Sequence, residues 1–277
     1  MQAITGSASY LQGLYTPGTA MLQPALYIRN LAKAIASEGV SIYENSPVLS
    51  LHQKDNYWLA KTPVGLVSAP KVILSVNGHL ESFGFFKRHL MHVYTYGSMT
   101  RALSDKEVAL LGGESRWALT PADPLGTTVR RISGIGGHRL IVRNRATFDA
   151  RLSVPDSRIQ QVARTHDRSF TDRFPQLSHV DMEFRWGGRL CLSRNNVSVF
   201  GEIEKNLFSA CCQNGLGTAK GTVSGKLAAE LACDQSSELL THQMSYEEPK
   251  KLPLKPLATI GANAVLRWGE FRAGKEL

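Results

Sequence analysis

The stretch "NLFSACCQNGLGTAKGTVSGKLAAELA" (residues 206–232) decides the fold, because an apolar run gives way to glycines and then to a helical pattern. Residues 207–212 have the pattern of a short buried strand, and Val223, Leu227 and Leu231 recur at helical spacing. The segment 214–218 is therefore predicted to be a strand-to-helix turn. Its backbone N–H groups are expected at the positive end of the helix.

Three glycines of this stretch need a physical explanation. A helix places Gly217, Gly221 and Gly225 on one face, although a glycine inside a helix costs roughly 1 kcal/mol relative to alanine. Neither common phosphate loop explains them: G-x-G-x-x-G has Lys220 in its third glycine place, and the P-loop pattern fails at Leu227. The turn is predicted to be either a ligand cradle or a device for close helix packing.

Composition limits the possible classes of protein. The chain has 277 residues, 43% of them apolar, which is enough for one large or two modest domains. Its apolar runs are shorter than the ~20 residues of a membrane helix, and "MQAITGSASY" lacks the order of a signal peptide. We therefore expect a cytoplasmic protein.

Charge and cysteine usage narrow the classes further. A net charge of +9 suits nucleic acid, an anionic cofactor or an acidic partner, but the Lys and Arg residues are scattered and no nucleic-acid motif is present. We expect no nucleic-acid partner. The four cysteines lack C-x-x-C spacing, which favours reduced core thiols over a metal site.

The first part of the chain predicts a helix and a β-meander. Residues 24–38 place Ile28, Leu31 and Ile35 on one helix face. Strand patterns follow at residues 40–42, 48–51, 57–60 and 64–67. Residues 71–76 form an apolar run typical of a strand in a sheet covered on both faces, and ligands tend to bind beyond the carboxyl ends of such strands.

The middle of the chain predicts a second domain. Residues 83–184 contain longer strands with aromatics, "HVYTYGSM" and "HRLIVRN", and a helical pattern around residues 159–170. The chain is then expected to return to the first sheet at "FRWGG" and to end in a proline-broken tail. The predicted division is residues 1–82 and 185–235 for one domain, 83–184 for the other, and 236–277 for the tail.

This order of motifs resembles the FAD-dependent amine and amino-acid oxidoreductases of the D-amino-acid oxidase superfamily. The motifs are "GVSIYENSPV", the meander, "KVILSVNG", the aromatic strands, "WGG" and "QNGLGTAKGTVSGKLAAEL". Glycine, sarcosine and γ-glutamylputrescine oxidases are the members that look most similar. The resemblance implies a mixed α/β fold, in which a partial FAD-binding domain with parallel strands, meander and helices joins an antiparallel substrate domain.

The resemblance also implies a cofactor site. In the family the glycine turn meets the polar edge of the flavin, the backbone of the "SPV" strand meets the adenine, and a small-residue turn covers the cofactor. Gly188 falls where sarcosine oxidases attach flavin covalently, so we expect noncovalent FAD. The cofactor residues expected on this basis are Val48, Asn77, Gly78, Gly188, Asn214, Gly215, Leu216, Gly217 and Thr218.

Flavin chemistry belongs to the cofactor, so we assign no catalytic residue and seek substrate-positioning residues instead. Tyr94 and Tyr96 alternate onto one strand face and suit an amine, and Arg143 suits a carboxylate. The alternative for each tyrosine is a half-buried core aromatic. The alternative for Arg143 is a solvated strand face. Leu190 stands where glycine oxidases carry a carboxylate-binding Arg, and adjacent Arg189 is expected to face the opposite way, which favours amines over free α-amino acids.

The chain departs from the family at its beginning. Family members open with a βαβ unit carrying G-x-G-x-x-G, and nothing before Pro24 matches it. We therefore expect that the N-terminal portion of the family is missing and that this chain alone binds FAD weakly. A second hypothesis is a catalytically silent fragment or split subunit that binds a separate chain supplying the rest of the FAD domain.

Overall fold

A computed structural model describes residues 1–149 and 153–277, and the chain divides into two compact units. Unit 1 comprises residues 1–19, 92–190 and 254–277, and unit 2 comprises residues 20–91 and 191–253. In mid-chain the units change after residues 91 and 190. The predicted boundaries, after residues 82 and 184, are therefore a few residues too early. The last residues form part of unit 1 rather than a separate tail.

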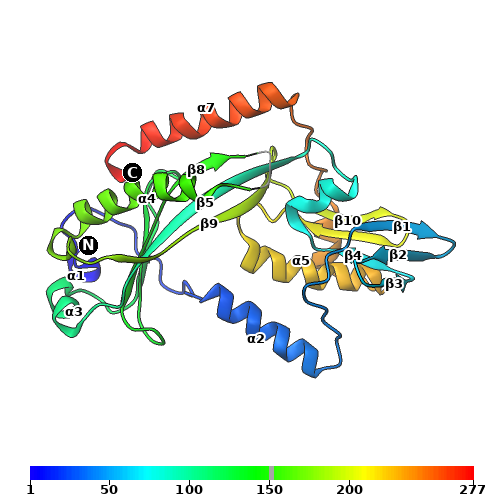
Figure 1. Cartoon of the computed structure of the whole chain (residues 1–277), viewed down its shortest axis with the longest axis horizontal. Helices are drawn as coiled ribbons and strands as arrows, with labels where there is room; N and C mark the ends of the chain where they lie inside the picture. Colours follow the sequence, from blue (N-terminus) through cyan, green and yellow to red (C-terminus); the bar gives the residue numbers. More distant parts are fainter. Residues whose placement is uncertain (150–152) are drawn as a thin grey trace. The chain divides into compact units, whose positions relative to one another are not determined.

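Unit 1 is built on a five-stranded sheet in the order β6-β7-β8-β5-β9 (Figure 1). The pairs β6–β7, β7–β8 and β5–β8 are antiparallel, as predicted for the second domain. The strands are β5 (Leu90–Thr100), β6 (Trp117–Leu119), β7 (Thr128–Ile132), β8 (Arg139–Phe148) and β9 (Met182–Ser193).

The sequence predicts that the "FRWGG" segment returns to the first sheet. In the structure it lies in β9, beside β5, and so belongs to the five-stranded sheet instead. A local sequence pattern predicts a strand but does not predict which other strand pairs with it. The pairing of β9 with β5 therefore could not be predicted from this segment alone.

Helices cover this sheet. The predicted helix α4 (Asp156–Arg173) is confirmed and packs on β8, where it buries Val162, Ala163 and Phe170. The other helices of the unit are α1 (Gln2–Thr5), α3 (Asp105–Leu111), α7 (Lys255–Ala273) and the short 3-10 helices η2 (Pro175–Leu177) and η3 (Gly274–Glu276). The main core comprises Leu103, Leu111, Trp117, Val129, Leu140, Val142, Phe170, Phe174, Leu177 and Val180.

The predicted proline-broken tail is wrong, because most of it forms the helix α7, which packs on β8 (Figure 1). Its proline lies in the first turn, where a missing N–H costs nothing. Arg145 Nη1 pairs with Glu270 Oε2 at 2.5 Å. Gly269 lies so near Leu125 that an added Cβ would be 2.5 Å from its Cδ1. These contacts bind α7 to the sheet.

Unit 2 contains two three-stranded sheets. The sheet β1-β2-β3 is the predicted meander, and the sheet β10-β11-β4 contains one parallel pair, β4–β11. No strand forms at residues 40–42, where Val40 and Ile42 are 51% and 46% exposed, because this segment has no partner strand among the described residues. The strands are β1 (Ser50–Lys54), β2 (Tyr57–Lys61), β3 (Leu66–Ala69), β4 (Val72–Leu74), β10 (Val199–Glu204) and β11 (Leu207–Cys211).

The helices of unit 2 are α2 (Pro24–Ser37), α5 (Gly217–Ala232), α6 (Glu238–Met244) and the 3-10 helix η1 (Asn77–Phe83). The predicted helices α2 and α5 are both confirmed. The apolar face of α2 is not buried, however: Ile28, Leu31 and Ile35 are 55%, 42% and 39% exposed. The core of the unit comprises Trp58, Leu74, Leu80, Leu90, Cys191, Val199, Leu207, Cys211 and Cys212.

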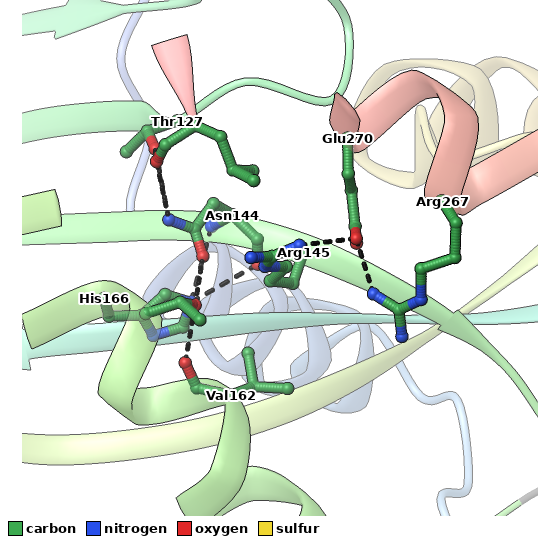
Figure 2. A network of polar contacts seen from close by, with 9 residues as sticks. Thr127, Asn144, Arg145, Val162, His166, Arg267 and Glu270 are labelled. Atoms are coloured by element: carbon green, nitrogen blue, oxygen red, sulfur yellow. Dashed lines mark hydrogen bonds and ion pairs between the residues drawn. The ribbon is translucent and has the colours of Figure 1, made fainter. Parts of the chain in front are cut away.

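A buried polar network joins β8, α4 and the end of the chain in unit 1 (Figure 2). Asn144 Nδ2 donates to Thr127 Oγ1 at 3.1 Å, and Asn144 Oδ1 accepts from Thr165 Oγ1 at 2.9 Å. The Nδ1 atom of His166 lies 2.8 Å from Ser98 Oγ. His166 is only 1% exposed, and this burial lowers its pKa to about 4.

We predict that His166 makes the chain less stable in acid. Only the unfolded chain binds the proton between pH 6.5 and 4, so stability falls as the pH falls through this window, by roughly 3 kcal/mol from this group. Urea unfolding at several pH values measures the effect. His166→Gln is expected to flatten the acid limb, whereas His52→Gln, at an exposed position, leaves it unchanged. An equally steep limb in His166→Gln would contradict the assignment.

Candidate functional site

The predicted glycine turn lies at the carboxyl ends of the parallel strands β4 and β11. The turn lies between β11 and α5, and Asn77 begins η1 soon after β4. Asn77 Oδ1 accepts a hydrogen bond from the backbone N–H of Cys212 at 3.2 Å. Two segments predicted to contact the cofactor, Asn77-Gly78 and residues 214–218, therefore meet at the sheet edge where ligands bind in α/β folds.

The side chain of Asn214 holds the turn in place. Its Oδ1 accepts from the N–H of Ser193 at 2.8 Å, and its Nδ2 donates to the carbonyl oxygens of Val197 and Cys212 at 3.0 and 3.1 Å. The backbone of Asn214 and Gly215 is left-handed, with φ of 50° and 81°. Asparagine and glycine tolerate this conformation better than other residues do, which explains their presence here.

The first turn of α5 offers backbone donors to a ligand. Its N-cap is Leu216, and no side chain of the described residues caps the helix. Gly215, Leu216 and Gly217 are exposed, and Thr218 is partly buried. Uncapped N–H groups at a positive helix end suit a carbonyl oxygen or an anion. The residues present therefore fit the polar edge of a flavin.

The three helical glycines are not a device for packing within the described part of the chain. A Cβ added at Gly217, Gly221 or Gly225 would meet no atom within 4 Å. The packing alternative is thus wrong for the described residues, and the bare face of α5 stays open. The ligand-cradle alternative remains a prediction.

The other predicted cofactor residues lie in different places. Gly78 is buried in η1. Val48 precedes β1 and is 40% exposed. Gly188 lies in β9, within unit 1, where an added Cβ would meet no atom within 4 Å. Only Asn77, Gly78 and the turn are therefore assembled by the contacts within unit 2.

Tyr94 and Tyr96 share one face of β5, as predicted, but that face is a core. They are 7% and 1% exposed and cluster with Val162 of α4. The hydroxyl groups of Tyr96 and Thr147 lie 2.6 Å apart, and burial raises the pKa of Tyr96. This position agrees with the core alternative that the sequence left open.

Arg143 lies on the opposite face of the sheet. It pairs with Gly97, whereas Tyr96 pairs with Asn144, and strand neighbours alternate between faces. The register shifts near Arg145, whose φ of 61° marks a bulge. The structure therefore separates Arg143, which is exposed, from the two tyrosines.

The face of Arg143 carries aromatics that the sequence reasoning did not assign to a site. Trp186 and Phe184 are 42% and 45% exposed. Trp186 lies on Gly97, where an added Cβ would be 2.6 Å from Cζ2. Alternation places Leu190 on the side of Trp186. The sequence does contain a pattern that predicts this face: aromatic residues alternate in "FRWGG", and "YTYGS" has a glycine on which an aromatic ring of a neighbouring strand can pack.

The cysteines of the chain are all free. Cys191, Cys211 and Cys212 are buried in unit 2, as expected for core thiols, and Cys233 is exposed. Burial raises the pKa of Cys211. No group of three or more His, Cys, Asp or Glu residues within the described ranges could hold a metal ion.

Comparison with known proteins identifies the family of this chain. Residues 2–231 match the family model DAO, described as FAD dependent oxidoreductase. The chain belongs to the DAO family.

Two curated relatives are longer than this chain. The chain is 24% identical over 263 residues to the probable oxidoreductase OrdL of Rhizobium meliloti. The aligned residues are 94% of this chain and 57% of the relative. The OrdL of Haemophilus influenzae is 26% identical over 227 residues, which are 50% of its length. The chain thus spans about half the length of the curated relatives it matches.

Solved structures share the fold. Iminodiacetate oxidase from Chelativorans sp. BNC1 has a TM-score of 0.64 at 16% identity and covers 84% of this chain and 61% of its own. Glycine oxidase from Geobacillus kaustophilus has a TM-score of 0.60 at 17% identity and covers 76% and 54%. At these identities the likeness shows the fold.

We predict that Gly97→Ala displaces Trp186, because the new methyl group would overlap the indole ring. The variant should be less stable by about 1–3 kcal/mol and should show a changed near-ultraviolet circular dichroism spectrum. Gly188→Ala is the matched control, since space is open there. Equal spectra and stabilities for the two variants would show that Trp186 does not rest on Gly97.

Proposed function

We propose that this chain forms part of an FAD-dependent enzyme that oxidises the C–N bond of an amine or an N-substituted amino acid. The observation that carries the proposal is the exposed turn at residues 214–218, which ends the parallel pair β4–β11 and opens an uncapped helix in a member of the DAO family. The names of two proteins of similar fold, iminodiacetate oxidase and glycine oxidase, agree with this class of substrate.

Bound FAD would supply the hydride acceptor, and the chain would supply binding, orientation and shelter from water. In unit 2, the N–H groups of Gly217 and Thr218 would donate to the polar edge of the ring, while Asn77 and Asn214 hold the turn. In unit 1, the exposed ring of Trp186 would provide an apolar wall for the substrate. These roles require no proton relay from the chain.

The proposed FAD is noncovalent. Gly188 has no nucleophile at the position where relatives with covalent flavin carry one, and nearby Cys191 is 2% exposed within the core of unit 2. Acid precipitation of the flavin-loaded protein should leave the yellow colour in the supernatant, and colour in the pellet would contradict this assignment.

We predict that Gly217→Asp weakens FAD binding by tenfold or more. An aspartate in the first turn can accept the same N–H groups that the flavin would use, and its charge opposes an anionic ligand. Flavin fluorescence during titration of the purified chain measures the affinity. Gly225→Asp lies on the same open face but further along α5, beyond the first turn, and should bind FAD as the unchanged chain does.

The same titration distinguishes the second hypothesis. Tight stoichiometric FAD binding with turnover of any amine would refute a silent fragment. Activity that appears only after addition of a separately expressed domain with G-x-G-x-x-G would support a split subunit. Equal affinities for Gly217→Asp and Gly225→Asp would remove the glycine turn from the cofactor site.

We also predict that flavin-loaded enzyme prefers amines to free α-amino acids, because Leu190 cannot bind a carboxylate. A dye-reduction screen over both classes measures the preference. If glycine or a D-amino acid is the better substrate by tenfold, which is about 1.4 kcal/mol in transition-state binding, the prediction fails. Arg143→Met should then raise the KM for carboxylate substrates alone, since Arg143 is an exposed cation on the face of Trp186.

A further inference from the structure

The outward face of α7 carries large apolar side chains that are mostly exposed. Elsewhere on the helix, Glu270 binds β8, and Gly269 lies against Leu125 of the β6–β7 connection. The exposed fractions are 66% for Leu257, 67% for Ile260, 70% for Val265, 63% for Trp268 and 73% for Phe271.

These five side chains form one continuous stripe. At 3.6 residues per turn they fall within an arc of about 140° around the helix axis. The rings of Trp268 and Phe271 stack with centroids 5.7 Å apart, so the stripe ends in an aromatic pair. Contiguous apolar patches of this kind mark interaction surfaces rather than ordinary solvent-exposed surface.

The exposed charged side chains beside the stripe are cationic. By helical position Arg267 borders the stripe, and Arg272 falls within its arc between Trp268 and Val265. Lys275, also exposed, follows the helix. Glu270 is the one acidic residue of the α7 sequence, and it is 3% exposed because it faces inward and pairs with Arg145 and Arg267 (Figure 2). Arg267 is thus paired with Glu270, and the outer face of α7 presents apolar groups together with the exposed cations Arg272 and Lys275.

This combination fits one occupant better than others. A second copy of the chain docked on the stripe would bury Arg272, which lies within the stripe, away from water, and the stripe itself offers no carboxylate to pair with it. No helix among residues 1–149 and 153–277 is long and apolar enough to cross a membrane. An apolar stripe with Trp and Phe, flanked by Lys and Arg, is instead typical of a helix lying on a lipid surface.

We propose that the outer face of α7 binds the surface of an anionic phospholipid membrane. Trp268, Phe271 and the aliphatic residues of the stripe enter the boundary between headgroups and acyl chains, and Arg272 and Lys275 contact phosphate groups. This inference is independent of the proposed oxidation, since none of these residues belongs to the candidate site.

Vesicle co-sedimentation of the full chain tests the proposal. We expect the chain to bind vesicles containing about 30% phosphatidylserine and to bind pure phosphatidylcholine at least tenfold more weakly, with the difference lost in 0.5 M salt. The double variant Trp268→Ser/Phe271→Ser should lose at least tenfold in binding. Ile135→Ser is the matched control, because Ile135 is fully exposed in the β7–β8 connection and far from α7 in sequence.

Arg272→Glu separates the electrostatic contribution from the apolar one. We expect it to lower binding to anionic vesicles severalfold without changing the circular dichroism spectrum. Equal binding to both kinds of vesicle, or full binding by the double variant, would overturn the proposal. A chain that ignores vesicles but forms dimers, as measured by analytical ultracentrifugation and abolished by Trp268→Ser/Phe271→Ser, would assign the stripe to a second copy instead.

Discussion

The parallel pairing of β4 with β11 is the interaction on which the candidate site depends. Asn77 and Cys212 lie 135 positions apart, yet a hydrogen bond joins them where these two strands end. At the other end of α5, Lys71 donates to the carbonyl oxygen of Ala232 at 2.6 Å, which ties the helix to the strand that β11 pairs with. The strand pair and this anchor together set where the exposed first turn of α5 lies.

Unit 1 depends on a sheet with two unlike faces. One face packs on α4 and buries Tyr96, while the other leaves Trp186 exposed on Gly97. Arg145, which lies at the bulge of β8, forms an ion pair with Glu270 of α7. This ion pair joins the sheet to α7. An open surface on one face and a core on the other use the same strands, because successive side chains of a strand point to opposite sides.

The positive charge of the chain has more than one role. Taken as a whole, it suits nucleic acid, an anionic cofactor or an acidic partner. The structure distributes it: Arg145 serves an internal ion pair, Arg143 lies on the open face of the sheet, and Arg272 lies within the apolar stripe of α7. Local placement therefore says more about partners than the net charge of +9 does.

The sequence by itself determined the elements whose signals are local. The helices α2, α4 and α5, the meander, the buried strand β11 and the strand-to-helix turn at residues 214–218 all follow from periodicity and from the placement of glycines. Only the tertiary structure decided that β9 pairs with β5 and that Tyr96 is a core residue while Arg143 is not. It also decided that the proline-containing end forms a helix on β8. These outcomes depend on which distant segment supplies the partner, and hydrophobic periodicity shows that a residue is buried without showing against what.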